Sequence, residues 1–229
     1  MLDVKGLSAG YGQSEVLHGI SFRAGVNETV AIMGRNGMGK STLFRTLIGL
    51  MRASAGSVAI DGIEISRLES YQRVKAGIGY VPQGRMIFPT LTVEENILTG
   101  LESTARRQIP DEIFAMFPVL WDMRRRRGGN LSGGQQQQLA IARALVTEPK
   151  VLLLDEPTEG IQPSIIKEIA RALNEIRKSR GITIVVSEQV LSFALDVADR
   201  LLVIEGGRFV HETHRDDTDV NHVRRYLSV

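Results

Sequence analysis

The sequence predicts an α/β fold with short strands in its N-terminal part and a helical subdomain set into the α/β core. Three observations lead to this prediction. Short apolar runs separated by glycine-containing turns fill the N-terminal part, at 2–4, 20–23, 30–33, 57–60 and 78–81. From Thr92 to about Arg127 the apolar residues recur at helical spacing. Beyond Gly133, helical and strand-like segments alternate, which is typical of a parallel sheet with crossover helices.

The segment from about 92 to 130 is expected to be the helical subdomain of a single domain that spans 1–229. One apolar helical face comprises Val93, Ile97, Leu98 and Leu101, and a second apolar set comprises Ile113, Phe114, Phe117 and Leu120. We expect Trp121 and its phenylalanine neighbours in the core of this subdomain. A groove for a partner helix near Gln83 is the alternative interpretation.

After this insert, caps and helix breakers define the elements. A helix is expected over 136–146, and the fully apolar run 151–154 is expected to be a central parallel strand. Pro163 suits the first position of the next helix, whose apolar face comprises Ile165, Ile166, Ile169, Leu173 and Ile176. The run 183–187 is expected to be a core strand beside 151–154. A helix through Ala198 and a hairpin turning on Gly206-Gly207 should follow.

Composition and charge exclude several classes of protein. The net charge of +2 comes from 28 basic and 26 acidic side chains, so it gives no support for nucleic acid as a partner. The run Arg124–Arg127 is interpreted as a solvated face, since few aromatic residues accompany it. The absence of cysteine excludes disulfides and cysteine metal sites. No apolar run is long enough to span a bilayer, and no signal peptide is expected.

A phosphate site is predicted by the stretch Gly34-Arg35-Asn36-Gly37-Met38-Gly39-Lys40-Ser41, which matches the pattern Gly-x4-Gly-Lys-Ser/Thr. An apolar strand precedes this stretch, and Thr42 continues it into a helical run that ends at Gly49. The inward-turned backbone N–H groups and the helix N-terminus favour phosphate. Lys40 is expected to reach the β- and γ-phosphates, and the Ser41 hydroxyl to ligate magnesium. A glycine-rich turn with a surface lysine is the less favoured alternative.

A second magnesium ligand is expected at the end of the apolar run 151–154, where Asp155 and Glu156 follow. An aspartate at the end of a buried strand must be paired or bound to a metal ion, because burying a lone carboxylate is costly. Glu156 lies one residue further on, toward the γ-phosphate, where a carboxylate can orient and polarise water. Two carboxylates that cap a following helix are a weaker interpretation beside a phosphate loop.

A third motif lies at Leu131-Ser132-Gly133-Gly134-Gln135. Ser132 has the pattern of a helix N-cap, and the exposed amides of the glycines make a second anion site. This stretch resembles the signature of ABC ATPases, a class of P-loop NTPases, and other family elements occur in order over essentially the whole chain. The resemblance implies a P-loop core with an N-terminal antiparallel β subdomain and a helical subdomain. It implies that Tyr11 stacks on adenine. It also implies that Gln83, in Tyr80-Val-Pro-Gln83, contacts magnesium and water and senses a membrane partner.

The resemblance also implies an assembly. ABC ATPases form head-to-tail dimers in which the signature of one subunit, here 131–135, acts in trans on the ATP of the other. The chain is one bare cassette without long coiled-coil arms or fused membrane spans, which suggests a separate ATPase subunit of an importer. Its expected partners are transmembrane permease subunits, a second ABC ATPase subunit and, indirectly, a periplasmic binding protein. In isolation a homodimer could replace the heterodimer. The expected location is peripheral, on the cytoplasmic face of the inner membrane.

A finer resemblance concerns the transported substrate. The segments 80–89 and 91–96, with Phe117-Pro118, are similar to the branched-chain amino acid uptake branch. The segments 134–140 and 156–163 resemble its urea subgroup, in the smaller ATPase subunit. An importer of urea is therefore expected, with branched-chain amino acids as the alternative substrate. An ABC protein that uses ATP as a switch for a soluble partner is the alternative of a different class.

Two positions depart from the family pattern. Gln162 replaces the aspartate usual before Pro163, which puts cross-dimer signalling through that carboxylate in doubt. Gln189 stands where the family usually delivers a histidine to the γ-phosphate. A glutamine amide can donate a hydrogen bond there, but it cannot carry a proton near pH 7. We therefore expect the site with Glu156 and Gln189 to hydrolyse ATP more slowly than a companion site in an asymmetric heterodimer.

Overall fold

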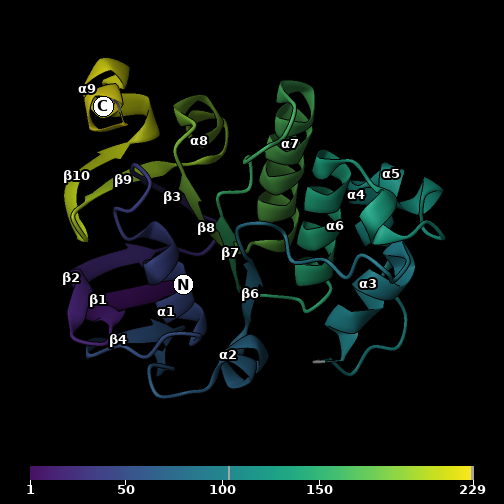
Figure 1. Cartoon of the computed structure of the whole chain (residues 1–229), viewed down its shortest axis with the longest axis horizontal. Coiled ribbons are helices and arrows are strands. Elements are labelled where there is room, and N and C mark those ends of the chain that lie inside the picture. Colours follow the sequence, from purple (N-terminus) through teal and green to yellow (C-terminus); the bar gives the residue numbers. More distant parts are fainter. Residues whose placement is uncertain (103, 228–229) are drawn as a thin grey trace.

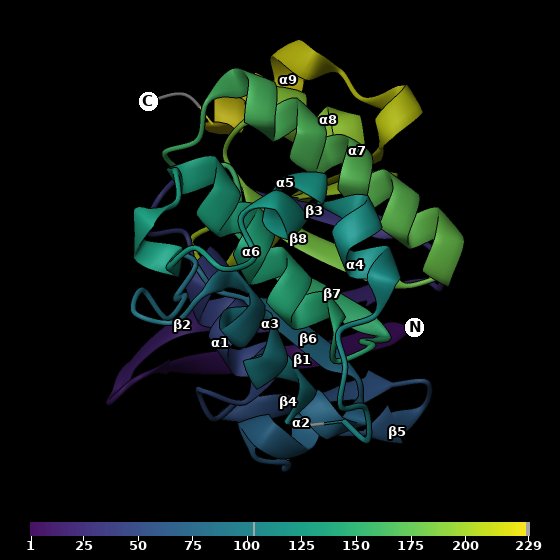
Figure 2. The same cartoon turned by 90° about the vertical axis from the view of Figure 1, so that its right-hand side faces the viewer.

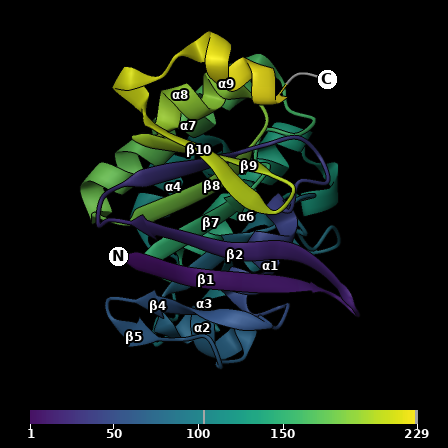
Figure 3. The same cartoon turned by 90° about the vertical axis from the view of Figure 1, so that its left-hand side faces the viewer.

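The computed structural model describes residues 1–102 and 104–227, and its strands form two sheets (Figure 1). The smaller sheet has the order β2-β1-β4-β5 with antiparallel neighbours, and it faces the viewer in Figure 3. Its strands are β1 (Leu2–Tyr11), β2 (Ser14–Ala24), β4 (Ala55–Ile60) and β5 (Ile63–Glu64). This sheet confirms the prediction of an N-terminal antiparallel β unit.

The larger sheet has the order β10-β9-β3-β8-β7-β6, and all neighbouring pairs are parallel except β10 with β9. Its strands are β3 (Thr29–Met33), β6 (Ile78–Val81), β7 (Val151–Asp155), β8 (Thr183–Glu188), β9 (Arg200–Glu205) and β10 (Arg208–His214). The apolar run at 151–154 is an interior strand, as predicted, because β7 lies between β8 and β6. The predicted pairing of 183–187 with this strand and the hairpin on Gly206-Gly207 are confirmed.

Helix α1 (Lys40–Ile48) packs between the two sheets. Alternating residues of β3 serve two separate cores, as the pleat of a buried strand requires. Val30 and Ile32 face α1 and the smaller sheet, whereas Ala31 and Met33 face the helices on the other side. The fold therefore fixes the phosphate-loop segment, which connects β3 to α1, from both faces of the sheet.

Helix α2 (Ser70–Ala76) contributes a buried arginine to the end of α1. Arg73 is 3% exposed, and its guanidinium donates to the carbonyl oxygens of Thr46 and Leu47 at 2.8 and 2.9 Å. It also donates to the carbonyl oxygens of Ser66 and Leu68, at 2.6 and 3.0 Å. Burial lowers the pKa of this guanidinium. A cation at the C-terminus of α1 also suits the negative end of the helix dipole.

The remaining helices cover the opposite face of the larger sheet, as Figure 2 shows for α3 to α7. They are α3 (Val93–Leu101), α4 (Asp111–Met116), α5 (Pro118–Asp122), α6 (Gly133–Leu145), α7 (Pro163–Arg180), α8 (Leu191–Val197) and α9 (Val220–Leu227), with short 3-10 turns at Gly128–Asn130 and Arg215–Asp217. Pro163 does begin a helix. The helix expected over 136–146 begins earlier, at Gly133, because Ser132 caps it. No helix in the described part of the chain is long and apolar enough to cross a membrane.

Two expectations for the helical segment are wrong. Trp121 is 50% exposed, and Leu98 lies at the surface beside the buried Val93 and Ile97. The Trp121 ring packs edge-on against Phe114 and lies under the guanidinium of Arg124, 4.0 Å from its centroid. These contacts stabilise the Trp121 ring at the surface, because a cation over the face of an aromatic ring can take the place of apolar neighbours. The buried aromatic residue of this segment is Phe117.

Candidate nucleotide-binding site

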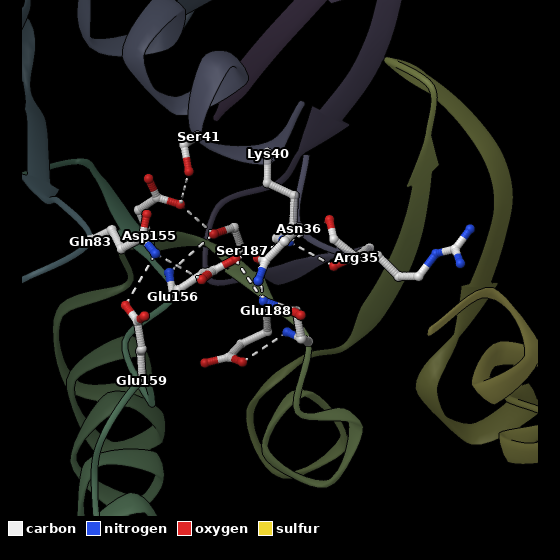
Figure 4. Close-up of polar contacts among 12 residues, drawn as sticks. Arg35, Asn36, Lys40, Ser41, Gln83, Asp155, Glu156, Glu159, Ser187 and Glu188 are labelled. Atoms are coloured by element: carbon white, nitrogen blue, oxygen red, sulfur yellow. Dashed lines mark hydrogen bonds and ion pairs between the residues drawn. The ribbon is translucent and has the colours of Figure 1, made fainter. Parts of the chain in front are cut away.

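Four neighbouring strands deliver the candidate site residues to one edge of the larger sheet. In the spatial order β3-β8-β7-β6, the carboxyl ends of these parallel strands lead into the phosphate loop, Gln189, the Asp155-Glu156 pair and Gln83. Residues 33, 81, 155 and 188 therefore end the four strands side by side. Ligands of open α/β sheets bind at this edge. Figure 4 shows the polar side chains converging there.

The phosphate loop closes tightly around its own lysine. A side chain at Gly34 would place Cβ 2.6 Å from the carbonyl oxygen of Ile204, so the loop passes directly against β9. Gly39 precedes α1 with φ of 107°, a conformation that favours glycine. Lys40 is 3% exposed, and its Nζ donates to the carbonyl oxygens of Gly34 and Arg35, at 2.6 and 3.0 Å. The loop is thus shaped as an anion cradle with a fixed cation at its base.

The lysine also pairs with the acidic strand end. Lys40 Nζ lies 2.9 Å from Glu156 Oε1, and both side chains are buried. Glu156 leaves β7 with φ of 47°, which is uncommon for a residue other than glycine, asparagine or aspartate. Its N–H donates to the carbonyl oxygen and to Oγ of Ser187, at 3.1 Å each. This backbone turn brings the carboxylate to the phosphate loop, where a buried ion pair compensates both charges.

Asp155 and Ser41 form the candidate magnesium position. Ser187 Oγ donates to Asp155 Oδ1 at 2.6 Å, and Ser41 Oγ approaches the same oxygen at 3.4 Å. Burial raises the pKa of the Asp155 carboxyl, and the two hydroxyl hydrogen bonds oppose that rise. Within the described residues, no group of three His, Cys, Asp or Glu side chains could hold a metal ion. One carboxylate and one hydroxyl fit Mg²⁺, which takes few protein ligands and completes its shell with phosphate oxygens and water.

Gln83 lies on the Glu156 side of the site. Its Nε2 donates to Glu156 Oε2 at 3.2 Å and to Glu159 Oε2 at 3.1 Å. Arg85, two residues further on, donates to the carbonyl oxygen of Glu159 at 2.8 Å. These hydrogen bonds connect the segment after β6 to the segment after β7. The role of Gln83 as a metal ligand stays a prediction.

Gln189 and Glu188 point to different surroundings. Gln189 Nε2 donates to Asn36 Oδ1 at 2.7 Å and to Glu156 Oε1 at 3.2 Å. The Glu188 carboxylate is 2% exposed and accepts hydrogen bonds from Thr158. Gln189 thus connects the phosphate loop to Glu156, whereas Glu188 is buried against Thr158. The role of Gln189 toward a γ-phosphate stays a prediction.

Substitution of Gln189 is expected to change both the rate and the pH profile of ATP turnover. Q189A removes the hydrogen bonds to Asn36 and Glu156, so turnover should fall about tenfold. Q189H restores a donor that ionises near pH 6.5, and its protonated form suits a site with Glu156 and phosphate. Turnover of Q189H should therefore rise toward the acidic side of pH 6 to 8, unlike that of the unmodified protein. Steady-state rates across this range test both effects, and an unchanged rate for Q189A would contradict the first.

A hollow of about 470 Å³ opens above the phosphate loop. Its lining comprises Tyr11, Val16, Asn36, Gly37, Gly39, Lys40, Ser41, Thr42, Gln83 and Glu156. Tyr11 is 52% exposed at the rim, where its hydroxyl accepts a hydrogen bond from Arg45 at 3.4 Å, and this contact lowers the pKa of the phenol. The sequence prediction missed Val16 and Arg45, since neither belongs to a motif.

The signature segment lies apart from this hollow. Ser132 caps α6, with its Oγ accepting from the Gln135 N–H at 3.4 Å and its own N–H donating to Gln135 Oε1 at 2.9 Å. A Cβ at Gly134 would meet Ile165 at 2.6 Å, so α6 packs closely on α7. None of 131–135 lines the hollow formed by Tyr11 and the phosphate loop. Action of this segment on a second subunit stays a prediction.

A phosphate loop that faces a strand-end aspartate and glutamate, on a parallel sheet beside an antiparallel one, defines a nucleotide-hydrolysing protein. A family model described as ABC transporter matches residues 17–159. The chain is 41% identical to the high-affinity branched-chain amino acid transport ATP-binding protein BraG of Pseudomonas aeruginosa, and the match covers 93% of each chain. The lipopolysaccharide export system ATP-binding protein LptB of Haemophilus influenzae is 35% identical, with 92% of this chain and 89% of LptB covered.

Solved structures of ATP-binding cassettes have the same fold as this chain. An ATP-binding subunit of an ABC transporter superposes with a TM-score of 0.84 at 26% identity, covering 99% of each chain. A dimeric cassette in a post-hydrolysis state with ADP and Pi gives 0.83 at 27% identity, covering 94% of this chain and 99% of the other. The chain belongs to the ABC transporter family, as an ATP-binding subunit that hydrolyses ATP with Mg²⁺. Such subunits dimerise and pair with transmembrane permease components.

Proposed function

We propose that this chain is the ATPase subunit of an importer for branched-chain amino acids. The observation that carries the proposal is the 41% identity to BraG over nearly the full length of both chains. A second relative, the probable branched-chain amino acid transport ATP-binding protein LivF of Archaeoglobus fulgidus, is 36% identical, with 91% of this chain and 89% of LivF covered. Both proteins are named for amino acid transport. The chain would act at the cytoplasmic face of the membrane, with a second ATPase subunit and a periplasmic binding protein in the same system.

Urea, the substrate first expected from segments 134–140 and 156–163, becomes the second candidate. The relatives named above provide no support for urea, whereas two of them are named for branched-chain amino acids. Both candidates need the same ATP chemistry, so the substrate has to be decided by transport and by the ligand of the binding protein. If the chain instead used ATP as a switch for a soluble partner, it would not be recovered with a permease.

In the proposed reaction, Glu156 directs water at the γ-phosphate, while Lys40 and the backbone of the phosphate loop hold the phosphates. Ser41, Asp155 and Gln83 would hold Mg²⁺, which supplies charge neutralisation on the phosphate oxygens. The Gln189 amide would donate to the γ-phosphate. The contacts of Glu156 with Lys40 and Gln189, at 2.9 and 3.2 Å, support these roles because they gather the three side chains at one point.

The proposed permease contact is an apolar groove beside the Gln83 segment. The groove has a volume of about 540 Å³ and lies between α2 and α3, with Leu50, Tyr71, Met86 and Phe88 among its lining residues. These four side chains are 62%, 62%, 66% and 47% exposed. Large apolar side chains gathered at a surface mark a partner site, and a groove of this kind accepts a helix. Met86 links the groove to Gln83 through the short segment after β6.

Charged substitutions in this groove are expected to release the permease. Y71E or F88E would place a carboxylate in an apolar contact, so recovery of the permease with this chain should fall about tenfold or more. ATP binding by the purified chain should be unchanged, because neither residue lines the hollow at the phosphate loop. Co-purification from membranes measures the first effect. The control is V210E, since Val210 is 44% exposed on β10, at the other end of the larger sheet.

Uptake tests the function as a whole. Cells that lack the gene should lose saturable uptake of labelled leucine or valine and regain it with the intact chain. They should not regain it with E156Q. Retention of leucine uptake together with loss of urea uptake would replace the first candidate by the second. If the chain were recovered only with soluble partners and neither uptake changed, the transport proposal would be wrong.

A further inference from the structure

A buried carboxylate behind the proposed catalytic residues has no assigned role. Glu188 is 2% exposed at the end of β8, and no salt bridge found among the described residues involves it. One oxygen, Oε1, accepts from the N–H and the hydroxyl of Thr158, at 3.1 and 2.7 Å. The other, Oε2, accepts from the N–H groups of Gln189 and Val190, at 2.9 and 3.1 Å. The carboxylate therefore spans two segments of the site.

All four contacts are donors to Glu188. An ionised carboxylate accepts at both oxygens. A protonated acid or an amide would instead turn a donor toward one side, where at least one backbone N–H cannot accept it. The ionised form is therefore the one that fits. Burial raises the pKa of the Glu188 carboxyl, and the bonds from Thr158, Val190 and Gln189 oppose that rise. A buried charge without a cation is kept only where such hydrogen bonds satisfy it.

The two segments that Glu188 joins each carry a proposed catalytic side chain. Thr158 lies two residues beyond Glu156, and the Gln189 backbone supports the amide that contacts Glu156 Oε1 at 3.2 Å. We propose that Glu188 is a positioning residue for ATP hydrolysis, which holds the Glu156 segment and the Gln189 segment as one unit. The inference rests on the proposed roles of Glu156 and Gln189.

Loss of the hydrogen bonds through which Glu188 joins the two segments should affect the chemical step more than nucleotide binding. E188Q presents an amide donor to either Thr158 or the Gln189 and Val190 N–H groups. At least one backbone N–H on that side then loses its acceptor, and we expect that segment to shift away from residue 188. A displacement of about 1 Å at a catalytic group can cost on the order of a hundredfold, and we expect kcat of E188Q to fall tenfold or more. The KM for ATP should stay within about twofold, because the phosphate loop is untouched.

Thr158 provides an independent variant that spares the buried charge. T158V loses the hydroxyl hydrogen bond to Glu188 but keeps the backbone N–H, while T158S keeps both. We expect kcat to fall in T158V and to remain near the unmodified value in T158S. E28Q is the matched control, since Glu28 is a partly buried carboxylate that accepts from Gly25 and pairs with Arg200, away from the site.

The experiment measures ATP turnover in the assembled transporter and amide hydrogen exchange of the purified full chain. E188Q should lower kcat and increase exchange in peptides that cover both 156–162 and 189–192, whereas E28Q should do neither. Turnover of folded E188Q within twofold of the unmodified protein would overturn the proposal. If E188Q fails to fold, equal turnover of T158V and T158S would overturn it and a loss confined to T158V would support it. E156Q is measured in parallel. If E156Q loses turnover and E188Q does not, only the positioning role of Glu188 is wrong; if E156Q keeps its turnover, the proposed catalytic role of Glu156 is wrong.

Discussion

E156Q is expected to reduce ATP turnover at least about a hundredfold while the chain still binds nucleotide, because loss of a positioned general base typically costs two to four orders of magnitude. Glutamine keeps the size of the side chain and a hydrogen-bonding oxygen for Lys40. It loses the charge that we propose polarises water, and with it the ion pair to Lys40 Nζ at 2.9 Å. Removing this pairing also frees the lysine for phosphate, so affinity for ATP should be retained or increased.

Turnover and nucleotide binding should therefore be measured separately. Steady-state phosphate release gives the first quantity, and titration with a fluorescent ATP analogue gives the second. E64Q makes the same chemical change on the exposed strand β5 and should leave both quantities unchanged. Turnover of E156Q near that of the unmodified chain would show that another group acts on water.

R73M is expected to destabilise the fold by about 3 kcal/mol. A single hydrogen bond from a charged donor contributes about 1.5 to 3 kcal/mol, and the bonds to the four carbonyl groups do not add up, because burying the guanidinium costs free energy that offsets part of them. Two of these carbonyls, of Thr46 and Leu47, are at the end of α1, where unpaired groups are concentrated. Methionine replaces the length of the arginine stem but supplies no donor. For a domain of this size the melting temperature should fall by about 6 to 12 °C.

Thermal unfolding followed by circular dichroism tests this prediction. K75M is the matched control, because Lys75 is an exposed cation on the same helix, 5.9 Å from the centroid of the Tyr71 ring. Its unfolding should change by no more than about 0.5 kcal/mol, as is usual for surface sites. Equal melting temperatures for R73M and the unmodified chain would mean that water or the backbone can replace the guanidinium.

The sequence predicts which residues gather at the candidate site better than it predicts the contacts among them. The phosphate loop and the Asp155-Glu156 pair are contiguous motifs in a strand–loop–helix context, so their local structure determines most of their placement. Gln189 could be located because it directly follows an apolar strand, at the position where the resembled family usually carries a histidine. The contact between Glu188 and Thr158 could not be predicted, since it depends on which way two strand ends turn once β7 and β8 are paired.

The errors in the fold have physical causes too. The strand pattern of β1 and β2 is disguised by register shifts near Leu7 and Ala9, which interrupt the alternation of buried and exposed residues. Both strands are therefore longer than their apolar runs suggest. Trp121 was expected in the core because it is aromatic, yet the cation above its ring comes from Arg124, part of a run that composition marks only as a charged face.

The strand order of the larger sheet also has a consequence for the synthesis of the protein. β8 lies between β3 and β7 although it is translated after both, so the phosphate loop and the acidic pair share no continuous sheet until residue 188 has been made. Pairings between such distant segments form slowly, and the apolar strand edges stay open in the meantime. The nucleotide site is therefore expected to form only late in synthesis, and the apolar edges of β3 and β7 should stay exposed until β8 pairs with both.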